Sequence, residues 1–278
     1  MRAPAALAAP ARAALALAAF ALASPLAGQT APAAASQEIA AGIAAYDARD
    51  PATALDHFRA ALRADSTSYE ANWRAALAAL ALGTGGSDSV AGPERDSLYA
   101  EAVRDARRAV KANSGDAQGW FVLANALGRA ALTQRLEERV KLAGEVHDAA
   151  VRAIRLDPKH DGAYHVLGRW NAEIMRLPGV SRFLARQVLG ARVFGEASWE
   201  GAIANLERAV QLDSTRITHR LDLATVYLDR KRFDDARRQL EAIAALPVRD
   251  YSDPLYKRQA AALLQSIPTR AASADRRE

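Results

Sequence analysis

Four alanine-rich, apolar stretches of the chain end in nearly the same way. Residues 61–66 read ALRADS, 109–114 read AVKANS, 153–158 read AIRLDP and 209–214 read AVQLDS. In each, a helical apolar pattern is followed by Asp or Asn and then by Ser or Pro. Proline cannot continue a helix, and serine or aspartate can cap the next one. The pattern therefore predicts helices that break near residues 66, 114, 158 and 214.

The segments after these breaks share a register of large and small residues. Large residues at such offsets fill the space between neighbouring helical hairpins, and small ones let antiparallel helices approach closely. The members are Gly42, Ala54, Phe58 and Ala61; Trp120, Leu123, Ala124 and Leu127; Tyr164, Leu167 and Gly168; and Leu223, Ala224, Tyr227, Ala236 and Leu240. Among the aromatic residues, Trp120, Tyr164 and Tyr227 are expected to pack rather than to bind.

This register resembles the tetratricopeptide repeat family across most of the chain. The resemblance implies an all-α, right-handed α-solenoid of about five helical hairpins, closed by a capping helix over 253–267 whose outer face is polar. The repeat domain is expected over residues 36–267, and a disordered tail is expected over 268–278. The breaks lie 48, 44 and 56 residues apart, whereas this repeat has 34. Long insertions are therefore expected, first as a glycine-rich loop over 83–97 and next as a charged helical extension over 132–146.

The third insertion, residues 179–199, mixes apolar and basic residues at helical spacing. Its first interpretation is a helix that folds back on the array and buries its apolar face. The alternative is a basic amphipathic surface for a partner helix or a membrane, carried by Arg182, Phe183, Arg186 and Arg192.

A closer resemblance covers residues 138 to 267. Its residues are ERVKLAGEVHDAAVRAIRLDPKH from position 138, YHVLGRW from 164, the arginine-rich insertion that ends in Leu189-Gly190-Ala191 and Phe194-Gly195, and LPVR from 246. In this stretch the chain resembles the regulator of microtubule dynamics family of tetratricopeptide proteins. The resemblance implies the same helical architecture; in animals that family is associated with microtubules and with contacts between organelles.

The first 35 residues have the features of an export signal. Arg2 and Arg12 precede an apolar run of eleven residues, 13–23, which is too short for a bilayer core of about twenty residues. Small residues follow, so we expect cleavage between Ala27 and Ala35 and export, into a bacterial periplasm or beyond it. Gln29 stands where a lipoprotein would need cysteine, which excludes a lipid anchor. The alternatives are an uncleaved anchor helix or a cytosolic amphipathic start.

Composition removes several classes of chemistry. The 278 residues include no cysteine, so disulfides, thiolate metal sites and thiol nucleophiles are absent. The five histidines form no H-E-x-x-H or H-x-H pair, so no metal site is expected. The net charge of +5 falls by two, to +3, if the leader is removed, which is too small an excess to indicate nucleic acid.

In these solenoids the first helix of each hairpin lines the concave face. Counting from each repeat start predicts a groove lined by Trp73, Arg74, Phe121, Asn125, Arg129, His165, Arg169, Glu173, Asp222 and Thr225. Arginine presents a fork of donors that matches two oxygens of a carboxylate or phosphate. An acidic peptide tail is therefore the expected ligand, although arginine on such a face can also be merely solvated.

No catalytic arrangement emerges from the sequence. The loop from Gly83 to Gly92 lacks the Gly-Lys-Ser/Thr ending of a P-loop, and the pairs Glu137-Glu138 and Asp234-Asp235 point in different directions on helices. We therefore expect an interaction scaffold without a cofactor and not an enzyme. The alternative is a lipid- or membrane-surface-binding module of the regulator of microtubule dynamics type that uses residues 179–199.

Overall fold

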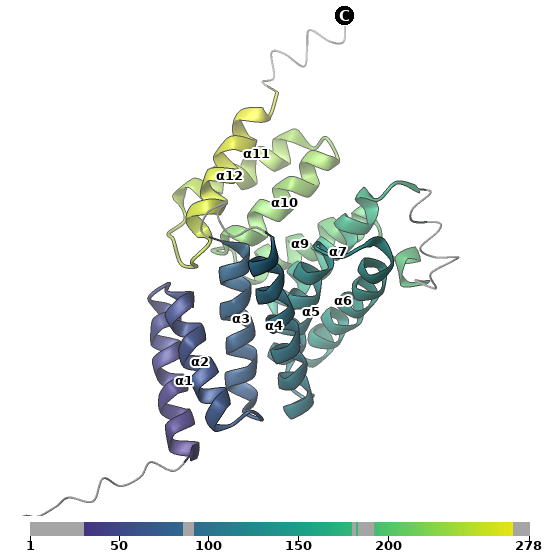
Figure 1. Ribbon diagram of the computed structural model, residues 1–278. Helices are drawn as coiled ribbons and strands as arrows, with labels where there is room; N and C mark the ends of the chain where they lie inside the picture. The colour runs from purple at the N-terminus through teal and green to yellow at the C-terminus, as the bar shows by residue number, and fades with distance from the viewer. Residues whose placement is uncertain (1–30, 86–91, 180–181, 183–191, 269–278) are drawn as a thin grey trace, which may run out of the picture.

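The computed structural model describes residues 31–85, 92–179, 182 and 192–268, and within these ranges every regular element is helical. The elements are α1 (Ala31–Asp47), α2 (Pro51–Ala64), α3 (Tyr69–Thr84), α4 (Pro93–Ala112), α5 (Ala117–Ala131), α6 (Leu136–Leu156), α7 (Asp161–Arg176), the 3₁₀ turn η1 (Arg192–Gly195), α9 (Trp199–Leu212), α10 (Ile217–Asp229), α11 (Phe233–Ala245) and α12 (Asp253–Ser266). The pairs α1–α2, α3–α4, α5–α6, α7–α9 and α10–α11 form five antiparallel hairpins stacked in chain order (Figure 1). The predicted α-solenoid is confirmed.

The repeated Asp or Asn in the sequence ends the second helix of each of the first four hairpins. Its side chain accepts a hydrogen bond from the backbone two residues later: Asp65 from Thr67 at 2.9 Å and Asp157 from Lys159 at 2.8 Å. Asn113 and Asp213 do the same with Gly115 and Thr215. This short-range bond competes with helix and makes a tight turn. The four predicted breaks therefore lie between helices, as expected.

Glycine lets the two helices of a hairpin approach closely at two of the predicted positions. A Cβ on Gly42 would lie 2.5 Å from the ring of Phe58, and one on Gly168 would lie 2.6 Å from Leu206 Cγ. Both partner side chains are fully buried. The small residues of the register are thus required by packing within α1–α2 and α7–α9.

The loop predicted over residues 83–97 is shorter than expected at both ends, and α3 continues to Thr84. The helix α4 begins at Pro93, so residues 93–97 are helical and not loop, because proline suits the first turn of a helix and Gly92 supplies a φ of 79° before it. The second insertion extends α6 to 21 residues, so residues 136–146 are helical as predicted, whereas residues 132–135 form the turn that precedes this helix.

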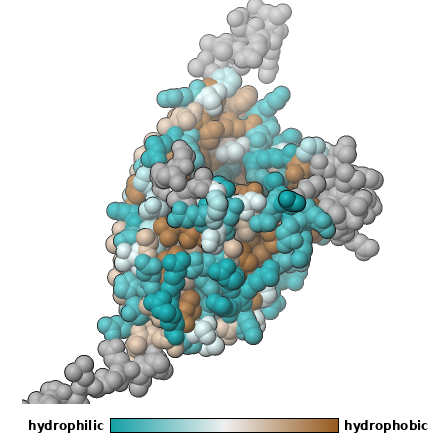
Figure 2. Space-filling view, in the orientation of Figure 1, coloured by the Kyte–Doolittle hydropathy of each residue, from teal (hydrophilic) through white to brown (hydrophobic). Residues whose placement is uncertain are grey.

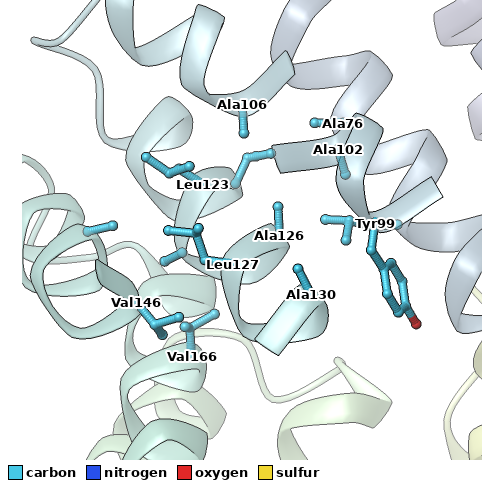
Figure 3. Packing of buried hydrophobic residues seen from close by; sticks show 14 of the residues in the cluster. Ala76, Tyr99, Ala102, Ala106, Leu123, Ala126, Leu127, Ala130, Val146 and Val166 are labelled. Atoms are coloured by element: carbon cyan, nitrogen blue, oxygen red, sulfur yellow. The ribbon is translucent and has the colours of Figure 1, made fainter. Parts of the chain in front are cut away.

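The core follows the stacked hairpins. Figure 3 shows Ala76, Ala102 and Leu123 from successive helices packed together, with Val146 and Val166 at the next interface. A second cluster joins α9 to α12 and includes Leu206, Leu223 and Leu240. In α12, Ala260 is buried while Arg258, Gln259 and Gln265 are exposed, which is the expected pattern of a cap.

The ends of the array lie close together. Arg49, in the α1–α2 turn, donates from Nη1 to the carbonyl of Val248, beyond α11, at 3.2 Å. Figure 1 shows the loop before α12 next to the end of the first hairpin. The first hairpin therefore contacts the segment that follows α11. Hydrophilic residues cover most of the face in Figure 2, with small apolar patches between them.

The predicted export signal, apart from its last residues, and the predicted disordered tail lie outside the described residues. Among the helices that are described, none is long and apolar enough to cross a membrane.

Candidate functional site

A hollow of about 100 Å³ lies between α5, α6 and α7. Its walls are mostly apolar. The lining residues are Ala124, Asn125, Gly128, Arg129, Ala131 and Leu132; Arg139, Val140, Ala143 and Val146; His165, Val166, Arg169, Trp170, Glu173, Ile174 and Leu177; and Phe194. An apolar hollow with a few polar groups is the usual form of a ligand site. We refer to it as the α5–α7 pocket.

Five of the predicted groove residues meet in this pocket. Asn125 and Arg129 lie one turn apart on α5, and His165, Arg169 and Glu173 follow at the same interval on α7. Residues four apart lie on one face of a helix. Because α5 and α7 are the first helices of consecutive hairpins, these two faces line the same side of the array.

The other predicted residues lie elsewhere. Arg74 donates from Nε to Glu70 at 2.8 Å and lies 4.3 Å from the ring of Trp73. Phe121 packs between hairpins: its ring is 4.7 Å from that of His160 and covers the position where Gly162 has no side chain.

On α10, the hydroxyl of Thr225 donates to the carbonyl of Leu221 at 2.9 Å, beside a separate shallow hollow. The structure therefore distributes the predicted residues over four places in the array.

Asp222 is the partner of two of the pocket residues. Its Oδ2 lies 2.7 Å from Nε2 of His165 and 3.5 Å from Nε of Arg169. Burial alone would raise the pKa of Asp222, but Arg169 and the hydrogen bond with His165 outweigh it and hold that pKa far below the usual range. Arg169 is thus already paired across α7 and α10, a contact that joins the fourth hairpin to the fifth.

Burial lowers the pKa of His165 to about 4, although its hydrogen bond with Asp222 opposes the shift. The ring of His165 lies 4.7 Å from that of His219, and a charge on one ring disfavours a charge on the other. His165 is therefore a neutral imidazole at pH 7.

A second histidine–carboxylate pair lies beside the first. His219 approaches Oδ2 of Asp161 with its Nε2 at 2.8 Å. Arg216 lies 3.6 Å from Asp161 and 3.1 Å from Asp250. Burial would raise the pKa of Asp161, yet the bond with His219 and the charge of Arg216 lower it to about 2. The sequence analysis missed this pair. The signal was present, because Asp161 and His165 are four apart on α7, and His219 and Asp222 are three apart on α10.

Arg139 is a further pocket residue that the sequence analysis did not name. It was missed because it lies in the inserted part of α6 and not on the first helix of a hairpin.

The described parts of the third insertion fold onto the array. Arg182 donates to the carbonyl of Met175 at 2.9 Å, and Phe194 is buried with its ring 6.2 Å from that of Trp170. Arg192 begins the turn η1, whereas Phe183 and Arg186 lie outside the described residues. The described ends of the insertion thus contact the array, whereas the predicted helix between them lies outside the described residues, and its use as a membrane or partner surface stays a prediction.

The fold and its concave site are those of a tetratricopeptide-type α-solenoid. The chain is similar to the crystal structure of TTC0263, a thermophilic TPR protein in Thermus thermophilus, with a TM-score of 0.59 and 20% identity over 84% of this chain and 100% of that one. It is also similar to the pilF protein of Pseudomonas aeruginosa (TM-score 0.49, 15% identity, 87% and 88% of the two chains). A third similar structure is YrrB, described as a TPR protein with an unusual peptide-binding site (TM-score 0.40, 15% identity, 80% and 90%).

Residues 38–268 match the model of the family RMD1-3, regulator of microtubule dynamics protein 1-3. The chain therefore belongs to this family, as the motifs around YHVLGRW indicated. No curated protein sequence matches it significantly.

Proposed function

We propose that this chain is an interaction scaffold that binds a protein or peptide partner on its concave surface, with the α5–α7 pocket as the main contact. The observation that supports the proposal most directly is the pocket itself, where an apolar hollow is combined with Asn125, Arg129 and Arg139. Solenoids of stacked hairpins expose such concave surfaces to partners.

We propose binding rather than catalysis because the two histidines near the pocket are each hydrogen-bonded to a carboxylate. The ring nitrogen Nε2 of His165 faces Asp222, and that of His219 faces Asp161. Within the described residues, no serine or threonine hydroxyl is hydrogen-bonded to either ring, so a nucleophile with an adjacent base is not assembled there. These pairs hold α7 against α10.

Export is part of the proposal, and the sequence supports it. The apolar run 13–23 and the small residues after it are features of a cleaved signal. The partner is accordingly sought in the cell envelope.

Capture of partners from that compartment tests the proposal. Arg129→Ala is expected to reduce the amount of captured partner about tenfold, the effect of one charge-assisted hydrogen bond lost from an interface. The matched control is Arg152→Ala, because Arg152 is exposed on α6, away from the pocket. Equal capture by both variants, measured by quantitative mass spectrometry, would contradict the assignment of this surface.

A further inference from the structure

The α5–α7 pocket carries two arginines at one end. Arg129 lies near the end of α5 at Ala131, and Arg139 lies near the start of α6 at Leu136, so the turn of the hairpin brings both to the same end. Both are half-buried. Within the described part of the chain, neither guanidinium makes a hydrogen bond or ion pair. Two cations without such partners beside an apolar hollow can bind the anionic group of a ligand.

The described carboxylates near the pocket already form ion pairs or hydrogen bonds with other residues. Glu173, which lines the same pocket, binds Arg176 at 2.6 Å, and Arg176 also binds Asp229. Asp222 is shared by His165 and Arg169, and Arg129 acts on it only as a weaker, more distant charge. The stretch 180–191, which follows α7, contains no Asp or Glu in its sequence. Among the described residues, no carboxylate forms an ion pair with Arg129 or Arg139, so both guanidiniums are available to an anion of a ligand.

The rest of the pocket suits one large apolar side chain. Val140, Val146 and Trp170 are buried in its floor, and Phe194 adds a further buried ring. The last residue of a polypeptide carries an apolar side chain and a free carboxylate on the same carbon atom. A single chain end can thus fill the hollow and reach the two guanidiniums.

The surroundings favour a peptide over a hydrocarbon chain. Asn125, one turn before Arg129, makes no side-chain hydrogen bond to any described residue, and His165, Arg169 and Asp222 lie next to it along the groove. A peptide backbone can donate and accept hydrogen bonds there, whereas a long hydrocarbon tail that left the pocket would cross charged groups.

We propose that the α5–α7 pocket binds the free C-terminal end of a partner protein whose last residue is large and apolar, with Arg129 and Arg139 on the terminal carboxylate. The inference rests on the proposed scaffold function and names the chemistry of its main contact.

The test uses the full chain and three fluorescent probes: an octapeptide of serine and glycine that ends in phenylalanine with a free carboxylate, the same peptide with an amidated end, and labelled dodecanoic acid. The free-acid peptide is expected to bind at least tenfold more tightly than the amide. The double variant Arg129→Gln/Arg139→Gln removes this preference, and Arg152→Gln retains it.

A second variant fills the hollow without disturbing the helix. A Cβ on Gly128 would lie 3.9 Å from Val146 Cγ2, an ordinary van der Waals contact, so Gly128→Leu places its first side-chain carbon at the pocket wall without a clash. Leucine also favours helix over glycine, so this variant should fold. Its affinity for the free-acid peptide is expected to fall at least tenfold, while its melting temperature stays the same or rises.

Several outcomes would overturn the inference: equal binding of the acid and the amide, binding of dodecanoic acid without the peptide, or no binding of either peptide. The scaffold proposal would survive them if Arg129→Ala still reduced partner capture, because a partner could use this surface without its chain end. If capture were unaffected as well, both proposals would fail.

Discussion

Replacing Trp170 by alanine is expected to lower the free energy of unfolding by about 3–5 kcal/mol, the range for deleting a large buried aromatic side chain. Trp170 is 5% exposed, and its ring lies 4.8 Å from His147 and 6.2 Å from Phe194. Its Nε1 donates to the carbonyl of Ala143 at 2.7 Å, so the variant also loses this hydrogen bond between α7 and α6. The loss should appear as a lower urea midpoint, followed by far-UV circular dichroism.

Trp120→Ala provides the matched control. Trp120 also donates its ring N–H to a carbonyl, that of Ser114 at 2.9 Å, but its side chain is only partly buried. We expect the midpoint to shift less than half as far as in Trp170→Ala. Equal shifts in the two variants would show that Trp170 does not anchor the α6–α7 interface.

Acidification from pH 6.5 to pH 4 is expected to destabilise the protein through His165, by about 2–3 kcal/mol from its lowered pKa of about 4. In this window the unfolded chain takes up a proton that the folded chain excludes, so stability falls as the pH falls. Above about pH 7.5 the ring is neutral in both states and contributes no pH dependence. The groups that face it are Arg169 on α7 and Asp222 and His219 on α10.

The effect is measured as a difference between two proteins. Burial raises the pKa of Asp105 to about 6, so Asp105 makes the unfolding free energy rise as the pH falls, opposite to His165. Burial lowers the pKa of His160, so His160 makes the unfolding free energy fall as the pH falls, as His165 does. His165→Gln retains a donor for Asp222 and leaves those other groups in place. Its unfolding free energy should depend less steeply on pH than that of the parent between pH 4 and 6.5. Parallel curves would show that His165 titrates normally.

The fold could be predicted from the sequence because its boundaries are set locally. An Asp or Asn followed by Ser or Pro bonds to backbone two residues away, so the turn does not depend on distant contacts. Gly42 and Gly168 mark places where only a hydrogen fits between helices. The length of the first loop was overestimated, because Pro93 was assigned to the loop although it begins α4.

The site could be predicted only in part. Helical periodicity places Asn125 and Arg129, and likewise His165 and Arg169, on one face whatever lies opposite. The partners of that face lie far away in sequence: Asp222 is 57 residues from His165, and His219 is 58 from Asp161. Periodicity within one helix contains no information on such pairs. It therefore could not distinguish the paired Arg169 from Arg129, which makes no ion pair with the described residues.

Photo-crosslinking in intact cells tests the concave surface most directly. A photoreactive amino acid is introduced at position 125, in the α5–α7 pocket, or at position 152, on the exposed face of α6. The account predicts a discrete covalent adduct of the chain with a partner protein from position 125 and none from position 152. An adduct from position 152 without one from position 125 would contradict it.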